Sequence, residues 1–181
     1  ACEKTCTATI PIINKPDCTV TPGDLNVCPG EAGVTFSAPT GVAPYAWSIT
    51  AGDATITSGG TTQTVTVKAG VQNFTVQVTV GSGSCSNTCT YDVVLKPLPT
   101  CSITPSKTDA CATEAGLTFT GPAGSFTYKW EFTGQANGAA IVGSTTSQTA
   151  TVTAGTDDFT IQLTVTDNTT GCSSFCTQAV N

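Results

Sequence analysis

The sequence contains no histidine, no methionine and no arginine, and all six of its basic residues are lysine. Charged residues make up 10% of the chain, against about 25% in an ordinary soluble domain, and the net charge is −6. Nucleic-acid binding requires clustered basic side chains that neutralise phosphates, so no nucleic-acid partner is expected. Histidine is the most common general base, and the sequence offers no other catalytic constellation. We therefore expect no catalytic residues and a protein that is not an enzyme.

Long apolar runs are also missing. No stretch of 18 consecutive apolar residues occurs, so no insertion into a membrane is expected. The first residues lack the basic and apolar regions of a signal peptide, as expected of a mature or excised chain. The charged residues that favour long helices are few, whereas threonine and valine, which favour strands, are abundant. The composition predicts an all-β fold.

Ten cysteines in 181 residues indicate an oxidising compartment, because disulfides persist in secreted and surface proteins. Zinc is the competing use of clustered cysteines. The spacing here is Cys-x3-Cys, as from Cys85 to Cys89, and no histidine is available as a further ligand. We therefore expect an extracellular or cell-surface protein with disulfides, no metal and no cofactor.

The chain consists of repeats. The segment Cys18-Thr19-Val20-Thr21-Pro22 returns 83 residues later as Cys101-Ser102-Ile103-Thr104-Pro105. Two short insertions raise this offset to 85 and then 87 along the second copy. The other cysteines follow the same alignment: Cys28 matches Cys111, Cys85 matches Cys172, and Cys89 matches Cys176. A fixed period of this length is typical of a tandem array of small domains.

The repeat also sets the expected domain boundaries. Residues 1–17 match the tail strand of a preceding repeat plus a linker, because Cys2-x3-Cys6 has the same spacing as Cys85-x3-Cys89. Residues 18–96 form the first repeat, 97–100 a proline linker, and 101–181 the second repeat, with its final strand truncated. The chain then reads as a segment of a longer array. The alternative is a free subunit whose N-terminal strand completes a neighbour by strand addition.

Short strands alternate with turns along each repeat. Phe74, Val76, Val78 and Val80 alternate with polar residues, which is the pattern of a half-buried strand. About seven such strands and one central tryptophan in about 83 residues are typical of an immunoglobulin-like antiparallel β-sandwich. The expected core aromatics are Phe36, Trp47 and Phe74 with their equivalents Phe119, Trp130 and Phe159. Sugar stacking is the alternative role for the tryptophans, but their mid-strand positions favour the core.

Acidic residues give two further hypotheses. Asp157-Asp158 and Asp167-Asn168 are candidate calcium ligands, but the first repeat has Gln72-Asn73 and Ser82-Gly83 at these positions, which favours solvated turns. Glu31 and Glu114 match each other, one in each repeat, just before a strand. A glycosidase needs two carboxylates across one cleft, so a role in capping a turn is preferred.

The order Cys28-Pro29-Gly30-Glu31, then Val34-Thr35-Phe36, then Trp47, then the alternating strand near Cys85 resembles a known group of repeats. These are the PKD-like and immunoglobulin-like tandem repeats of giant secreted Bacteroidota surface proteins, including gliding-motility adhesins and surface filaments. The resemblance implies a cell-surface adhesin or filament whose partners are neighbouring repeats or subunits.

Two other functions remain open. One is a module that binds glycans or another surface through the loops Thr50–Ala54 and Thr133–Ala140, where the repeats differ most. The other is an accessory module of a larger secreted enzyme.

Disulfide connectivity cannot be deduced from the sequence, but nested pairing within each repeat is the simplest scheme by count. It predicts Cys18–Cys89, Cys28–Cys85, Cys101–Cys176 and Cys111–Cys172, with Cys2 and Cys6 paired outside the chain. Seven alternating strands place Cys18 near Cys89 but Cys28 at the other end of the sandwich. Either the segment from Leu25 to Cys28 doubles back, or Cys28 reaches the next repeat near Cys101 and Cys176. Each bridge is expected to contribute about 2–4 kcal/mol.

Overall fold

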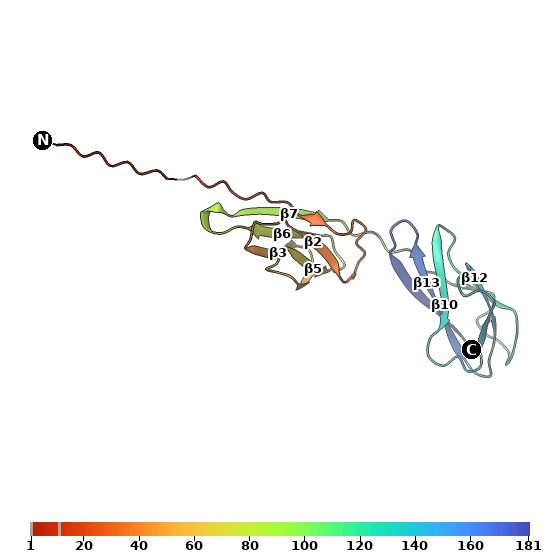
Figure 1. Cartoon of the computed structure of the whole chain (residues 1–181). Coiled ribbons are helices and arrows are strands. Elements are labelled where there is room, and N and C mark those ends of the chain that lie inside the picture. Colours follow the sequence, from red (N-terminus) through yellow and green to blue (C-terminus); the bar gives the residue numbers. More distant parts are fainter. Residues whose placement is uncertain (1, 11) are drawn as a thin grey trace. The chain divides into compact units, whose positions relative to one another are not determined.

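A computed structural model describes residues 2–10 and 12–181 (Figure 1). The chain divides into two compact units. The first contains Gly30–Val94 with the residues up to Leu25, and the second contains Leu95–Asn181 with Asn26–Pro29. The units follow the two sequence repeats except for Asn26–Pro29, which lies inside the first repeat in sequence and groups with the second unit.

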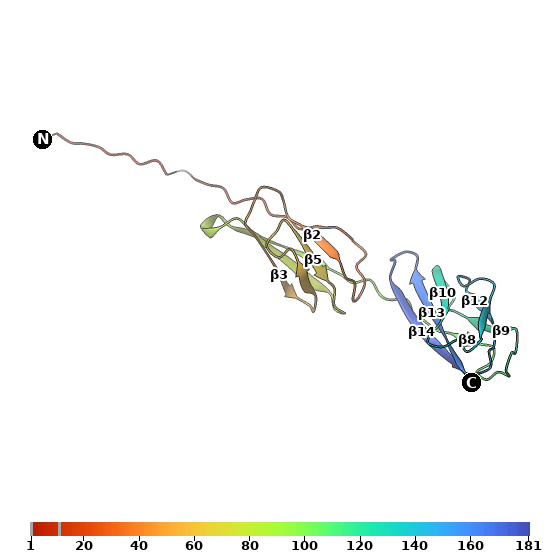
Figure 2. The same ribbon diagram turned by 60° about the horizontal axis from the view of Figure 1, so that its bottom comes forward.

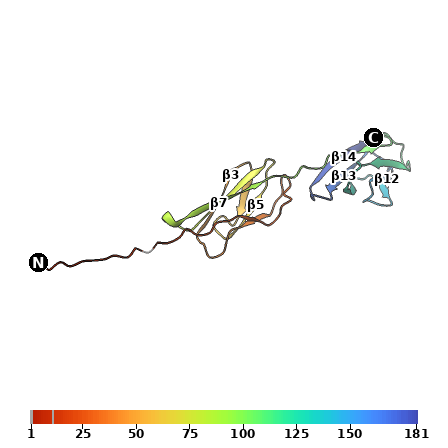
Figure 3. The same cartoon turned by 90° about the horizontal axis from the view of Figure 1, so that it is seen from above.

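The first unit is a sandwich of two antiparallel sheets, whose layers are visible in Figure 1 and, from above, in Figure 3. One sheet has the order β1 (Thr21–Pro22), β2 (Val34–Ser37), β5 (Thr64–Lys68) and β4 (Thr55–Ser58). The other has the order β3 (Tyr45–Ala51), β6 (Phe74–Val80) and β7 (Asn87–Val93). A short 3₁₀ turn, Gly83–Cys85, connects β6 to β7.

The second unit repeats this arrangement (Figure 2). One sheet has the order β11 (Ala140–Val142), β12 (Thr149–Thr153), β9 (Leu117–Thr120) and β8 (Thr104–Pro105). The other has the order β10 (Phe126–Phe132), β13 (Phe159–Asp167) and β14 (Ser173–Val180). A four-stranded sheet of strands 1, 2, 5 and 4 facing a three-stranded sheet of strands 3, 6 and 7 is the constant-type immunoglobulin topology. The predicted all-β immunoglobulin-like fold is confirmed.

The core lies between the two sheets of each unit. Strand β6 buries every second residue, and β13 does the same, as the alternating sequence predicted. The six predicted core aromatics, Phe36, Trp47, Phe74, Phe119, Trp130 and Phe159, are all buried. Each buried indole also has a hydrogen-bond acceptor: Trp47 donates to the Thr62 carbonyl at 2.8 Å and Trp130 to the Ser147 carbonyl at 2.9 Å. The tryptophans therefore fill the core and do not offer an open stacking face.

Strand β14 pairs with β13 from Phe159 opposite Val180 to Thr166 opposite Ser173. Its last residue, Val180, is the equivalent of Val93, the last residue of β7. In the first repeat the chain beyond Val93 still makes a backbone bond, from the Lys96 N–H to the Val27 carbonyl. The truncation of the final strand therefore stays a prediction.

The N-terminal segment forms no strand within this chain: residues 2–10 and 12–20 are extended and mostly exposed. Its residues 4–10 match β7 in sequence, but in each unit that edge position is already filled, by β7 or by β14. The tail strand of a preceding repeat therefore stays a prediction. The part of the chain that the structure describes has no helix of the length and apolarity needed to cross a bilayer.

Candidate functional site: the Cys28–Cys172 disulfide

Three disulfides form in the described part of the chain. Their Cα–Cα distances lie in the normal range for the bond: Cys18–Cys89 at 5.7 Å, Cys101–Cys176 at 5.7 Å and Cys28–Cys172 at 5.5 Å. The first two coincide with predicted pairs, and they are equivalent bonds in the two repeats. Each joins the segment before the first strand to the last strand of the same unit.

The third bond corrects the nested scheme. Cys28 bonds Cys172, so the predicted Cys28–Cys85 and Cys111–Cys172 bonds are wrong, and Cys85 and Cys111 are free thiols. The physical reason is distance. The Gly30 N–H donates to the Gly70 carbonyl, which places the Cys28 loop near the start of β6, whereas Cys85 follows the end of β6. A strand of that length spans about 20 Å, far beyond the reach of a disulfide.

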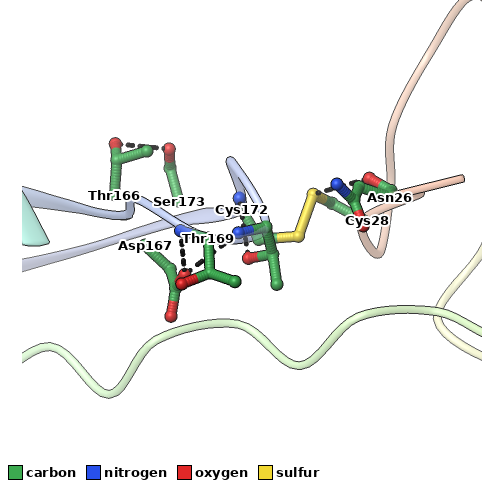
Figure 4. The surroundings of a disulfide bond; sticks show 8 residues. Asn26, Cys28, Thr166, Asp167, Thr169, Cys172 and Ser173 are labelled. Carbon is green, nitrogen blue, oxygen red and sulfur yellow. Dashed lines mark hydrogen bonds between the residues drawn. A yellow bond between two sulfur atoms is a disulfide. The ribbon is translucent and has the colours of Figure 1, made fainter. Parts of the chain in front are cut away.

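Cys172 lies in a tightly bonded hairpin turn between β13 and β14 (Figure 4). The Asp167 carboxylate accepts backbone N–H bonds from Thr169 at 2.7 Å and Thr170 at 3.0 Å. These two donors hold the pKa of Asp167 below its ordinary value, because they stabilise the charged carboxylate. The Asp167 N–H also donates to the Cys172 carbonyl at 2.9 Å. The turn therefore presents the Cys172 sulfur from a fixed backbone.

Three backbone hydrogen bonds hold the loop that carries Cys28. Gly30 donates to Gly70 at 2.8 Å, and Ala69 donates to the Glu31 carbonyl at 2.8 Å. On the N-terminal side of Cys28, the Val27 carbonyl accepts a bond from the Lys96 N–H at 2.9 Å, and Val27 itself is 1% exposed. The loop is thus fixed on both sides of the cysteine.

The matched glutamate of the second repeat caps a turn, as preferred from the sequence. Glu114 accepts the Cys111 N–H at 3.0 Å through its carboxylate and donates its own N–H to the Cys111 carbonyl at 3.0 Å. Its carboxylate is also paired with Lys107. The Lys107 hydrogen bond, and secondarily the Cys111 N–H, hold the pKa of Glu114 below its ordinary value.

Asp53, in the predicted binding loop Thr50–Ala54, has a structural contact that the sequence analysis missed. Its carboxylate accepts the Val71 N–H at 2.9 Å and the Gln72 N–H at 3.0 Å. The available signal was the Gly-Asp pair, since aspartate commonly accepts backbone N–H groups at turns. The candidate calcium ligands behave similarly: Asp167 closes its own turn, and no group of three or more potential ligands lies within the described residues.

We expect the Asp53 contact to be lost in acid. The Val71 and Gln72 donors lower its pKa, so the contact stabilises the fold above the ordinary aspartate pKa of about 3.9 and is lost as the pH falls through the lower folded value. An NMR titration should show the Val71 and Gln72 amide resonances moving together with a midpoint below 3.9. In Asp53→Asn the same resonances should not titrate. A midpoint at or above the ordinary value would show that the bonds do not form.

A family comparison covers the first repeat. Residues 15–93 match the model of the PKD-like domain. The first repeat is therefore similar to PKD-like domains. The second repeat shares its strand order and its equivalent cysteine bridge, so the chain contains two repeats of one architecture. No curated protein matches the chain.

Three solved structures that are similar to the chain are distant from it in sequence. A SusE-like surface-located polysaccharide-binding protein of Bacteroides thetaiotaomicron is 14% identical over 89% of this chain and 33% of its own, with a TM-score of 0.47. The titin fragment I67–I69 is 13% identical over 94% and 66%, with a TM-score of 0.36. The fibronectin(III)-like modules of Clostridium thermocellum CbhA are 16% identical over 90% and 92%, with a TM-score of 0.38. The chain thus spans about a third of the length of the SusE-like protein.

Proposed function

We propose that this chain is a segment of an extracellular surface filament or adhesin stalk. Its role is to carry tension along the filament, which is a structural and not a catalytic role. The observation that carries the proposal is the connectivity of the three disulfides. Cys28–Cys172 ties a segment of the first sequence repeat to the second unit, in addition to the bridge inside each unit. Disulfides of this kind also support an extracellular location, because they persist outside the reducing cytosol.

Two covalent routes run in parallel between Cys18 and Cys176. The first passes through Cys18–Cys89, residues 89–101 and Cys101–Cys176. The second passes along residues 18–28, through Cys28–Cys172, and along residues 172–176. Tension applied to the two ends of the chain is carried by these short routes. The sandwiches themselves are therefore shielded, and the loss of either route leaves the other.

This connectivity predicts the response to force. In a force-spectroscopy experiment with marker domains at both ends, the oxidised chain should show no unfolding step from residues 18–89. Removing Cys28–Cys172 alone, or Cys18–Cys89 alone, should leave that result unchanged. Removing both bridges should release the 71-residue separation of Cys18 and Cys89, a gain of roughly 250 Å in contour length.

The matched control removes Cys28–Cys172 together with Cys101–Cys176, which should release the 75-residue separation of the second unit instead. Full unfolding steps in the oxidised wild-type chain would contradict the proposal that the disulfide routes carry the tension. On native cells, antibodies against the chain should label filaments or stalks in electron micrographs. Label found only on dispersed secreted protein would also contradict it.

One observation favours a second candidate, glycan binding. The predicted loop Thr133–Ala140 borders an open cavity of about 370 Å³ in the second unit, with polar side chains from Thr133, Gln135, Asn137 and Asp158 in its lining. Amide and carboxylate groups in a wide hollow suit the hydroxyl groups of a sugar. A glycan array should distinguish the candidates: binding by the wild-type chain that Gln135→Ala abolishes would support it, and no binding would count against it.

A further inference from the structure

Two free thiols of the chain are the repeat equivalents of a bonded pair. Cys111 matches Cys28 and Cys85 matches Cys172, and Cys28 and Cys172 are bonded to each other. Cys111 is exposed and Cys85 is partly exposed, and neither has a disulfide partner in the described chain. We propose that Cys111 bonds to the Cys85 position of a following repeat of the same kind, here tested as a second copy of this chain. The inference rests on the proposed function as a segment of a filament or stalk.

The loop that carries Cys111 is built like the loop that carries Cys28. Three backbone N–H to carbonyl bonds around this loop occur in both repeats, all between 2.8 and 2.9 Å. In the first repeat they are Gly23 to Thr35, Gly30 to Gly70 and Ala69 to Glu31. In the second repeat the equivalent bonds are Ser106 to Thr118, Thr113 to Gly155 and Ala154 to Glu114. Thr113 even adopts a φ of 61°, close to the 75° of Gly30. This left-handed conformation is unfavourable for a β-branched residue, so the loop keeps the shape that bonds Cys28 despite a local cost.

The hairpin that carries the partner cysteine, Cys85 or Cys172, also has equivalent contacts in the two units. Asn87 donates its side-chain N–H to the Pro16 carbonyl at 2.9 Å, and its equivalent Ser174 donates to the matching Pro99 carbonyl at 2.5 Å. The segment before each repeat therefore lies against the same hairpin. The Cys85 sulfur lies 3.9 Å from the Ile13 carbonyl.

The position of Ile13 corresponds to that of Lys96. In the formed site, Lys96 donates its N–H to Val27, the residue before Cys28. Ile13 and Cys85 thus lie together in the first unit. They are the equivalents of Lys96, which donates to Val27, and of Cys172, which bonds Cys28. By the same pairing, Ile13 of a second copy would donate its N–H to Ala110, and Cys85 of that copy would bond Cys111.

The groups around the two thiols are compatible with this bond. Cys111 shares an open pocket with Lys107, Asp109 and Glu114, and Lys107 and Glu114 already neutralise each other. The neighbours of Cys85 in sequence are Ser84 and Ser86, which are small and uncharged. Asp109 is then the charged group of the Cys111 pocket that this ion pair does not include, and the sequence neighbours of Cys85 add no charge.

The chemistry is thiol–disulfide exchange. The thiols of Cys111 and Cys85 together give up two electrons and two protons, and one S–S bond forms. A small disulfide such as oxidised glutathione accepts the two electrons and the two protons, its S–S bond breaks, and two thiols result.

The test uses the full chain with Cys2 and Cys6 replaced by serine, which leaves Cys85 and Cys111 as the free thiols. In a glutathione redox buffer this chain should give a ladder of disulfide-linked multiples of 18.2 kDa on non-reducing gels. Cys85→Ser alone and Cys111→Ser alone should each stay monomeric. Mixed together, they should form a heterodimer and nothing larger, because only one compatible pair of thiols remains.

Peptide mapping then identifies the bond, and the three native bridges confirm that each variant is folded. A Cys111–Cys85 linked peptide supports the proposal. Homodimers of Cys85→Ser or of Cys111→Ser, or monomers with both thiols open to alkylation, would each overturn it. In native material, Cys111 linked to Cys85 identifies a second copy, and Cys111 linked to a different peptide identifies a following repeat. Filaments in which Cys111 is a free thiol would refute this inference and leave the proposed function standing.

Discussion

Replacing Trp130 by alanine is expected to destabilise the second unit by about 3–5 kcal/mol. The side chain is 2% exposed and lies in the core cluster with Phe119, Phe159 and Leu163. Its removal leaves a large cavity between the two sheets, because the surrounding strands can relax only in part. It also deprives the Ser147 carbonyl of the indole donor at 2.9 Å. The loss is a large fraction of the stability of a small domain.

Hydrogen exchange of the β13 amides, followed by NMR, should measure this change within the second unit. The matched control is Phe175→Ala on the neighbouring strand β14, because Phe175 is an aromatic residue that is 70% exposed. It should change the unfolding free energy by no more than about 0.5 kcal/mol. Equal effects of the two substitutions would show that Trp130 does not fill the core. The amides of β6 in the first unit should keep their exchange rates in both variants.

Replacing Cys28 and Cys172 together by serine is expected to lower the unfolding free energy by about 3.5 kcal/mol. The sequence separation of 144 overstates the loop that this bond closes, because the other two bridges shorten it. The shortest covalent path between the two cysteines runs along residues 18–28, 89–101 and 172–176, which is about 26 residues. Loop-closure entropy for that length gives the expected value.

Limited proteolysis and denaturant unfolding should both report the loss of this bridge. Without it, Asn26–Pro29 loses its covalent bond to the β13–β14 hairpin, and a protease of broad specificity should cut there first. The matched control is Cys111→Ser, which replaces the equivalent cysteine where the single chain forms no bond. It should leave the denaturation midpoint and the cleavage pattern unchanged. If the double variant behaves like this control, the Cys28–Cys172 bond does not contribute to stability.

The strand pattern was readable from the sequence because it depends on local periodicity. Residues of β6 alternate between buried and half-buried positions, as Phe74 and the valines after it indicated. The core tryptophans were identified for the same reason, since each lies in the middle of an alternating strand. The last residues of β14 and of its equivalent β7, Val180 and Val93, were not visible in the sequence. Strand ends depend on pairing with a neighbour, as Val180 pairs with Phe159.

The sequence by itself determined the two-repeat organisation, the all-β fold and the buried aromatics, and it placed Cys18 near Cys89 and Cys101 near Cys176. These follow from the period of the sequence and from the alternation of strand direction, which bring the two ends of each repeat together. The partner of Cys28 was decided only by the tertiary structure. Counting favoured Cys85 as its partner within the repeat, and a bond to the next repeat near Cys101 and Cys176 was one of the alternatives. The Lys96 N–H bond to the Val27 carbonyl holds the Cys28 loop beside the chain that leads into the second repeat, and Cys172 of that repeat lies within bonding distance. A disulfide forms only where two Cα atoms lie within about 7 Å of each other, and that distance is a property of the folded chain.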